Sequence, residues 1–148
     1  MQLSEQQLSF FDTFGYLAFP ELFKPQEVSW IIEEFEMVLQ THGGGKNHDG
    51  SKRTIIVPTI DHSAKLSTLL DDPRILGIAS EILGDDFNYG SGDGNYYSGD
   101  TGWHPDGGYP ELFAIKLAFY LDPLTRDTGC LRVLPGSCLL YTSDAADE

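Results

Sequence analysis

An alternating run, Phe113-Ala-Ile-Lys-Leu-Ala-Phe-Tyr-Leu121, is the clearest secondary-structure signal in this chain. Its odd-numbered positions are all apolar, whereas its even-numbered positions mix alanine with a lysine and a tyrosine. Because successive side chains of a strand point to opposite faces, this pattern predicts a β-strand in the wall of a barrel or sandwich. Asp122-Pro123 and Asp127-Thr128-Gly129 then predict a turn, and Cys130 to Leu134 predicts the next strand.

The first third of the sequence indicates helices instead. Residues 4–14 predict a short helix, because Ser4 and Gln7 have the spacing of a capping box and Gly15 follows. Pro25 opens a second helix with apolar residues at helical spacing, and Asp72-Pro73 begins a third that ends at Gly84. Short strands are expected at 16–19 and 54–57. The predicted fold class is therefore α+β, with N-terminal helices followed by a β-rich part.

The bulk composition limits the function classes. The 148 residues include 9 Lys plus Arg against 23 Asp plus Glu, a formal charge of -14, so we expect neither nucleic-acid nor anionic-membrane partners. Part of this charge, Glu33, Glu34 and Glu36, is predicted to form a solvated face of the second helix. No apolar run approaches the roughly 18 residues of a membrane span, and the start of the chain lacks a signal-peptide pattern, so we expect a cytoplasmic protein. Two cysteines support neither a disulfide framework nor a zinc site.

His104 and Asp106, in Trp103-His104-Pro105-Asp106, are the candidate metal ligands. A mononuclear iron oxygenase of the facial-triad type needs two imidazoles and one carboxylate, with the remaining positions open for co-substrate and dioxygen. Residues two apart on an extended chain point to the same side, so this pair meets two of the three requirements. A His-x-Asp pair arises easily by chance, and its sequence context has to support the interpretation.

That context resembles the phytanoyl-CoA dioxygenase family of Fe(II)- and 2-oxoglutarate-dependent oxygenases. Trp103-His-Pro-Asp-Gly-Gly108 is followed by the alternating run and by Asp127-Thr-Gly-Cys-Leu-Arg-Val-Leu-Pro-Gly-Ser137, and residues 3–17 are similar to the family's opening helix and strand. The resemblance implies a double-stranded β-helix, or jelly roll, that holds iron through His104, Asp106 and a later histidine. It implies a dioxygenase that uses 2-oxoglutarate and O2 to hydroxylate an aliphatic carbon of a small molecule. Related halogenases lack the carboxylate, so Asp106 favours hydroxylation.

The resemblance also suggests three residues near the co-substrate. Asn95 lies where the family often places an amide beside 2-oxoglutarate, although an Asn next to Gly94 is also typical of a turn. Tyr97 stands close to where the family often has a basic residue. Lys116 is the one cation of its predicted strand, and it could pair with the distal carboxylate of 2-oxoglutarate or simply lie on the surface. We predict that all three bind the co-substrate.

The sequence departs from the family beyond residue 137. No histidine follows His104, and Cys138 stands where the family usually has a histidine that is not an iron ligand. We expect residues 1–137 to be the N-terminal part of a single oxygenase domain and residues 138–148 to be a non-native tail. A chain of this kind lacks the third ligand and the usual co-substrate arginine, so we expect it to be an inactive fragment. The oligomeric state is left open.

Two other functions fit the same residues. One is a jelly-roll module that binds a sugar-like small molecule through the aromatic and glycine-rich segment 89–109. The other is a cupin-like isomerase that uses a metal without oxygenase chemistry. Consumption of 2-oxoglutarate that depends on Asp106 would separate the oxygenase from both.

Overall fold

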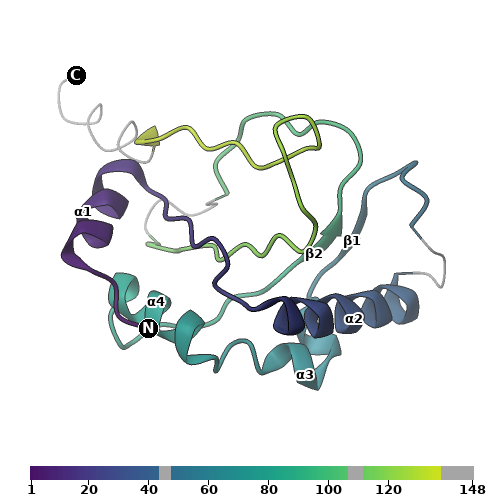
Figure 1. The fold of residues 1–148 in the computed structure, drawn as a ribbon, viewed down its shortest axis with the longest axis horizontal. Helices are drawn as coiled ribbons and strands as arrows, with labels where there is room; N and C mark the ends of the chain where they lie inside the picture. The colour runs from purple at the N-terminus through teal and green to yellow at the C-terminus, as the bar shows by residue number, and fades with distance from the viewer. Residues whose placement is uncertain (44–47, 107–111, 138–148) are drawn as a thin grey trace.

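The computed structural model describes residues 1–43, 48–106 and 112–137. In chain order its elements are α1 (Glu5–Phe14), α2 (Pro25–His42), β1 (Thr54–Ile56), the 3-10 helix η1 (Ile60–His62), α3 (Ala64–Ser67), α4 (Pro73–Leu83) and β2 (Gly94–Tyr96). Figure 1 shows α2 and α3 along one side of the β1–β2 pair and the irregular segments that follow β2 along the other. None of the described helices has the length and apolar character needed to span a membrane.

The helix ends form where the sequence predicted them. Ser4 caps α1 in a capping box with Gln7, and Gly15 ends that helix in the left-handed conformation, at a φ of 77° that glycine adopts without strain. α2 begins with Pro25 at its first position. Asp72 caps α4 by accepting a hydrogen bond from the backbone N–H of Arg74, 2.9 Å away.

The only sheet among the described residues is an antiparallel pair of short strands. Thr54 of β1 lies opposite Tyr96 of β2, and Ile56 lies opposite Gly94. The predicted strand at 54–57 is therefore confirmed over three residues, and its partner lies some 40 residues further along the chain. The two strands connect the helical part of the fold to the segment that carries the candidate ligands.

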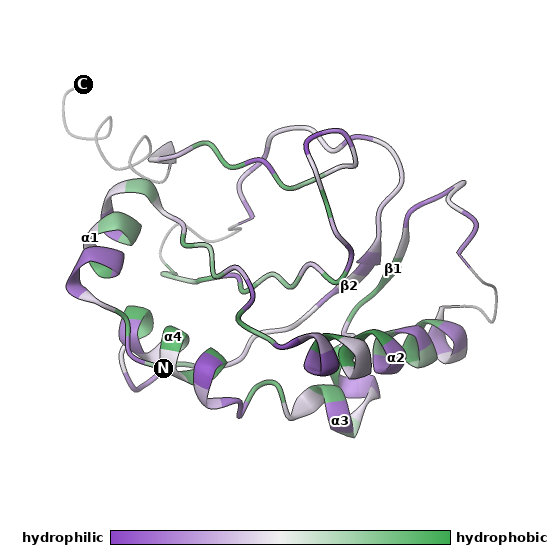
Figure 2. Ribbon diagram, viewed as in Figure 1, coloured by the Kyte–Doolittle hydropathy of each residue, from purple (hydrophilic) through white to green (hydrophobic). Residues whose placement is uncertain are grey.

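The core lies between α2, β1 and the short helix α3. Figure 2 shows hydrophobic and hydrophilic residues alternating along the ribbon of α2. The buried residues of this cluster are Ile31, Val38, Leu39, Ile56, Leu66 and Leu69. Because β1 contributes Ile56 to this cluster, packing of the core fixes the position of the strand pair.

One side of β2 faces this core and the other side does not. A methyl group added to buried Gly94 would meet the side chains of Phe35 and Thr59. The Tyr96 ring lies 5.7 Å from the Phe35 ring between centroids, and its hydroxyl bonds to Glu36 of α2. Asn95 and Tyr97 instead contact Arg53. The period of two in a strand thus places Gly94 and Tyr96 toward the helices and Asn95 and Tyr97 on the other face.

Three predicted strands do not form within the described residues. Segments 16–19, 113–121 and 130–134 have no ladder partner there, so these predictions were wrong for this structure. An alternating pattern suits a strand, but a strand also needs a neighbour that accepts and donates its backbone hydrogen bonds. The predicted turn does form, with the Thr128 N–H donating to the Thr125 carbonyl over 3.0 Å.

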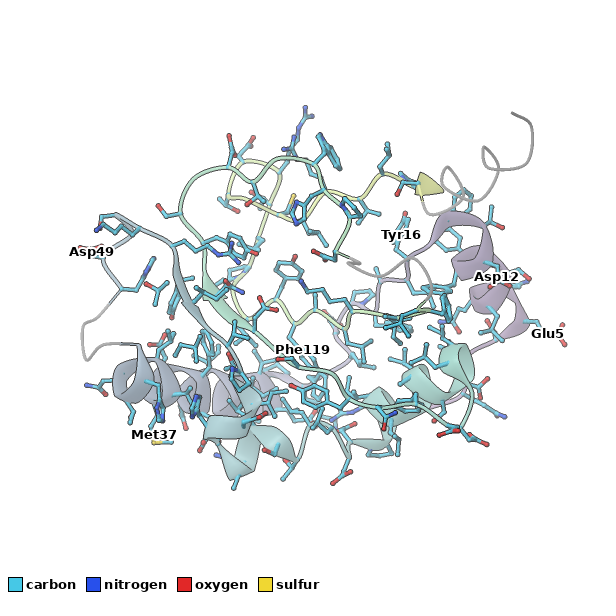
Figure 3. The ribbon with its side chains drawn as sticks, turned by 180° about the vertical axis from the view of Figure 1, so that it is seen from behind. Glu5, Asp12, Tyr16, Met37, Asp49 and Phe119 are labelled. Carbon is cyan, nitrogen blue, oxygen red and sulfur yellow. The ribbon has the colours of Figure 1, made fainter. Side chains whose placement is uncertain are left out.

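The alternating run still reaches the core at single points. Phe119, which Figure 3 places in the middle of the molecule, has its ring centroid 5.4 Å from that of Phe23. Leu121 packs against the buried cluster. Phe113, by contrast, is 70% exposed. The fold is therefore α+β as predicted, while the described residues contain no barrel.

The acidic face of α2 is less solvated than predicted. The Glu34 carboxylate accepts a hydrogen bond from the Ser63 hydroxyl over 2.8 Å and lies 3.3 Å from the ammonium of Lys65, with the Glu34 side chain 15% exposed. The hydrogen bond from Ser63 and the neighbouring lysine lower the pKa of Glu34. The Glu36 carboxylate accepts a hydrogen bond from the Tyr96 hydroxyl. Of Glu33, Glu34 and Glu36, only Glu33 is exposed and forms no side-chain hydrogen bond or ion pair among the described residues. The prediction missed these contacts because they come from residues distant in sequence.

Candidate functional site

His104 and Asp106 face one another, as their spacing predicted. The Nε2 atom of His104 lies 3.3 Å from Oδ1 of Asp106, and both side chains are more than half exposed. The Nδ1 atom of His104 lies 2.8 Å from the Gly102 carbonyl oxygen. Because a carbonyl can only accept, Nδ1 carries the hydrogen and Nε2 of the neutral ring keeps a free lone pair. In this neutral form the lone pair of Nε2 faces Oδ1 of Asp106, whereas in the protonated ring the same contact is an ion pair.

This pair fits two positions of a metal ion. In a six-coordinate site with bonds of about 2.1 Å, adjacent ligand atoms lie about 3 Å apart. The observed 3.3 Å is close to that value. A backbone carbonyl that accepts from Nδ1 is also one of the common partners of a metal-ligating histidine. Across residues 1–43, 48–106 and 112–137, however, no group of three His, Cys, Asp or Glu side chains could hold a metal.

Lys116 lies next to the pair and is held by carboxylates of the chain itself. Its ammonium is 3.3 Å from Oδ2 of Asp106 and 3.9 Å from Oδ1 of Asp93. Partial burial acts to lower the pKa of Lys116, but the attraction of Asp106 and Asp93 outweighs it, so the pKa lies above its usual value. Lys116 therefore stays charged. It pairs with Oδ2 of Asp106, so Oδ1 is the oxygen that faces His104.

Asn95 and Tyr97 are joined by an arginine that the sequence did not reveal. Arg53 donates from Nε to Oδ1 of Asn95 over 2.9 Å and from Nη2 to the Tyr97 hydroxyl over 3.1 Å. Its guanidinium carbon also lies 4.4 Å from the centre of the Tyr97 ring. Arg53 immediately precedes β1, so the antiparallel pairing of β1 with β2 brings these three residues together.

The predicted site residues thus belong to one connected group. The Asn95 amide donates to the Asp93 carboxylate, which in turn lies beside Lys116. Burial raises the pKa of Tyr120, and the charges of Tyr97 and Asp106 add to this effect. We call this group the polar cluster; its members are Arg53, Asp93, Asn95, Tyr97, His104, Asp106 and Lys116. The sequence indicated five of these seven residues and missed Arg53 and Asp93.

The remaining histidines lie elsewhere. The rings of His42 and His62 stack with centroids 3.9 Å apart, and the ring of His48 stacks on Tyr96 at 4.6 Å. Trp103 is 66% exposed and has the Arg132 guanidinium 5.3 Å from its ring centre. A second imidazole, which would be the third ligand beside His104 and Asp106, is therefore not among the described residues.

Comparison with known proteins agrees with these features. The family model for phytanoyl-CoA dioxygenase (PhyH) matches residues 11–147. The ectoine dioxygenase of Nocardia farcinica is 29% identical over 157 residues, which cover 92% of this chain and 51% of that protein. The ectoine dioxygenases of Stutzerimonas stutzeri and Halomonas elongata are 28% and 26% identical to this chain, and the matched regions cover 48% and 46% of those proteins.

The chain spans about half the length of these curated relatives. No solved structure gives a significant match. The family match nevertheless extends over most of the chain and includes the polar cluster, so the chain belongs to the phytanoyl-CoA dioxygenase family.

Proposed function

We propose that the native protein is an Fe(II)- and 2-oxoglutarate-dependent dioxygenase that hydroxylates an aliphatic carbon of a small molecule. The observation that carries the proposal is the convergence of His104 Nε2 and Asp106 Oδ1 at 3.3 Å. The ectoine dioxygenases among its relatives support the same reaction class. Iron and 2-oxoglutarate would supply the oxidising power: dioxygen gives one oxygen atom to the substrate and one to the succinate formed as 2-oxoglutarate loses CO2.

The chain's own residues have distinct parts in this proposal. The Gly102 carbonyl fixes the His104 ring so that Nε2 is the ligand atom. Asp106 supplies one oxygen to the metal, while Lys116 holds the other and thereby fixes the rotation of the carboxylate. Both candidate ligands are accessible to solvent, as is required of a site that exchanges co-substrate and product.

The proposal extends to parts of the protein that the described residues do not contain. We assign the third ligand to the portion of the native protein that corresponds to the uncovered half of its relatives. That portion would supply the strands that complete a jelly roll around segments 113–121 and 130–134. Residues 138–148, which we propose to be a non-native tail, lie outside the described residues.

The test uses the native full-length protein and two matched variants. We expect succinate to form from 2-oxoglutarate in the presence of Fe(II), dioxygen and a small substrate. Ectoine is the first substrate to test, because the relatives are named as ectoine dioxygenases. Asp106→Ala should lower the rate at least 100-fold and weaken Mn(II) binding, because a ligand is lost. Asp100→Ala, which removes an exposed carboxylate near the same motif, should change neither.

Two results would contradict the proposal. If Asp106→Ala retained the wild-type rate of succinate formation, Asp106 would not be a ligand. If the native protein bound Mn(II) through His104 and Asp106 but consumed no 2-oxoglutarate with any substrate, a binding module or an isomerase would be favoured. The 148-residue chain alone should bind Mn(II) weakly, since it offers two ligands in its described part.

A further inference from the structure

Arg53 differs from the other cation of the polar cluster in its partners. Lys116 has two carboxylates within 4 Å, from Asp106 and Asp93. Arg53 has none among the described residues, and both of its side-chain hydrogen bonds there go to neutral groups, Asn95 and Tyr97. The site therefore contains one cation that is already neutralised and one that is not.

The geometry of the guanidinium leaves one edge of Arg53 available. An arginine has five N–H donors, and the bonds to Asn95 and Tyr97 use the Nε donor and one Nη2 donor. The outer edge, formed by Nη1 and the second Nη2 donor, presents two parallel N–H groups. This is the arrangement that binds a carboxylate through two hydrogen bonds.

The same contacts hold Arg53 in place before a ligand arrives. The guanidinium lies over the Tyr97 ring at 4.4 Å and is fixed at two points by residues of the adjacent strand. A long exposed side chain usually loses much of its freedom on binding, and a group that is already ordered avoids most of that cost. Arg53 and Tyr97 are both exposed, so a ligand can reach the open edge from solvent.

We propose that Arg53 is a carboxylate-binding residue of this site, in place of Lys116. The inference rests on the proposed function, because it concerns a ligand of the same site. The carboxylate belongs either to 2-oxoglutarate or to the organic substrate; both present the same chemistry to the guanidinium. Asn95 and Tyr97 then act as positioning residues that orient Arg53.

The test compares succinate with its neutral analogue succinamide as probes. Each is titrated into the 148-residue chain and into the native protein, with binding followed by calorimetry and by the Arg Nε–H signals in NMR spectra. Wild type should bind succinate in preference to succinamide. Arg53→Met should weaken succinate binding about tenfold or more, because a charge-assisted pair of hydrogen bonds is lost. Arg53→Lys should fall between them, since it keeps the charge and loses the two-pronged geometry.

Lys52→Met is the matched control, because it removes a neighbouring exposed cation whose side chain forms no hydrogen bond or ion pair with the described residues. It should leave succinate binding unchanged, and all variants should keep the wild-type unfolding temperature within about 2 °C. Equal binding of succinate by wild type and Arg53→Met would overturn the inference. So would the absence of any preference for succinate over succinamide in both wild-type proteins.

Steady-state kinetics of the native protein then identify the source of the carboxylate. If Arg53→Met raises KM for 2-oxoglutarate alone, the carboxylate is that of the co-substrate; if it raises KM for the organic substrate alone, that substrate is a carboxylic acid. Failure of the proposed function would give a different result. The native protein would then form no succinate from 2-oxoglutarate, although its binding of added succinate would still depend on Arg53.

Discussion

Replacing Gly94 by alanine tests whether β2 is held as tightly against the helices as the structure indicates. An added Cβ would lie 2.7 Å from Oγ1 and 2.8 Å from Cγ2 of Thr59, and closer still to the Phe35 ring. Ordinary carbon contacts lie near 3.5–4.0 Å. Thr59 cannot easily turn away, because it is 5% exposed and its hydroxyl donates to the Ile56 carbonyl over 2.7 Å.

The expected cost follows from two opposing effects. Forcing a methyl group into a packed site costs about 1–3 kcal/mol. Alanine recovers about 0.5–1 kcal/mol, because glycine loses more backbone freedom on folding. The two effects combine to a net cost of about 0–2.5 kcal/mol, and because the added Cβ would lie under 3 Å from its neighbours we expect the upper part of this range. Gly94→Ala should therefore lower the free energy of unfolding by about 1.5–2.5 kcal/mol and the unfolding temperature by about 3–10 °C.

Thermal unfolding followed by circular dichroism at 222 nm measures this change. Gly90→Ala is the matched control, since a Cβ there meets nothing within 4 Å, and it should leave the unfolding temperature unchanged or slightly raised. If Gly94→Ala were as stable as Gly90→Ala, the close approach of β2 to Phe35 and Thr59 would be refuted. The placement of Asn95 and Tyr97 on the opposite face would then lose its support.

Two further predictions concern ionisable groups outside the polar cluster. Hydrogen bonds and charge from Arg74 lower the pKa of Asp72. The contribution of Asp72 to stability is therefore present above pH 4 and is lost as the pH falls through the lowered pKa. In urea unfolding, Asp72→Ala should cost about 1 kcal/mol at pH 7 and markedly less at pH 2. Burial and the neighbouring Glu36 raise the pKa of Tyr96 to about 12, so stability should fall as the pH rises from about 10 to 12. The pKa values of Tyr89 and Tyr120 are also raised by burial, so absorbance at 295 nm should show several late-titrating tyrosines, and Tyr96→Phe should remove the one that titrates near pH 12. An unchanged titration curve in that variant would contradict the assignment.

The features that could be predicted from sequence are those that depend on neighbouring residues. The ends of α1 and α4 follow from Ser4 with Gln7 and from Asp72, because a cap bonds to a backbone group two or three residues away. The His104–Asp106 pair follows from a spacing of two on an extended chain. Local chemistry is sufficient in each case.

The features that were missed depend on pairing across the chain. Arg53 reaches Asn95 and Tyr97 only because β1 pairs with β2, about 40 residues further along, and nothing near residue 53 indicates that register. Lys116 was expected to be available to 2-oxoglutarate, but Asp93 and Asp106 come close to it in the folded chain. The run 113–121 has the pattern of a strand but finds no ladder partner among the described residues.

The two-sided character of β2 has a practical consequence for engineering this protein. A library that seeks altered ligand preference can randomise positions 95 and 97, whose side chains lie on the face of Arg53. Positions 94 and 96 should be kept constant, because they pack against α2 and Thr59. A one-residue deletion within β2 would exchange the two sets, and would be expected to inactivate the site more severely than any single substitution in it.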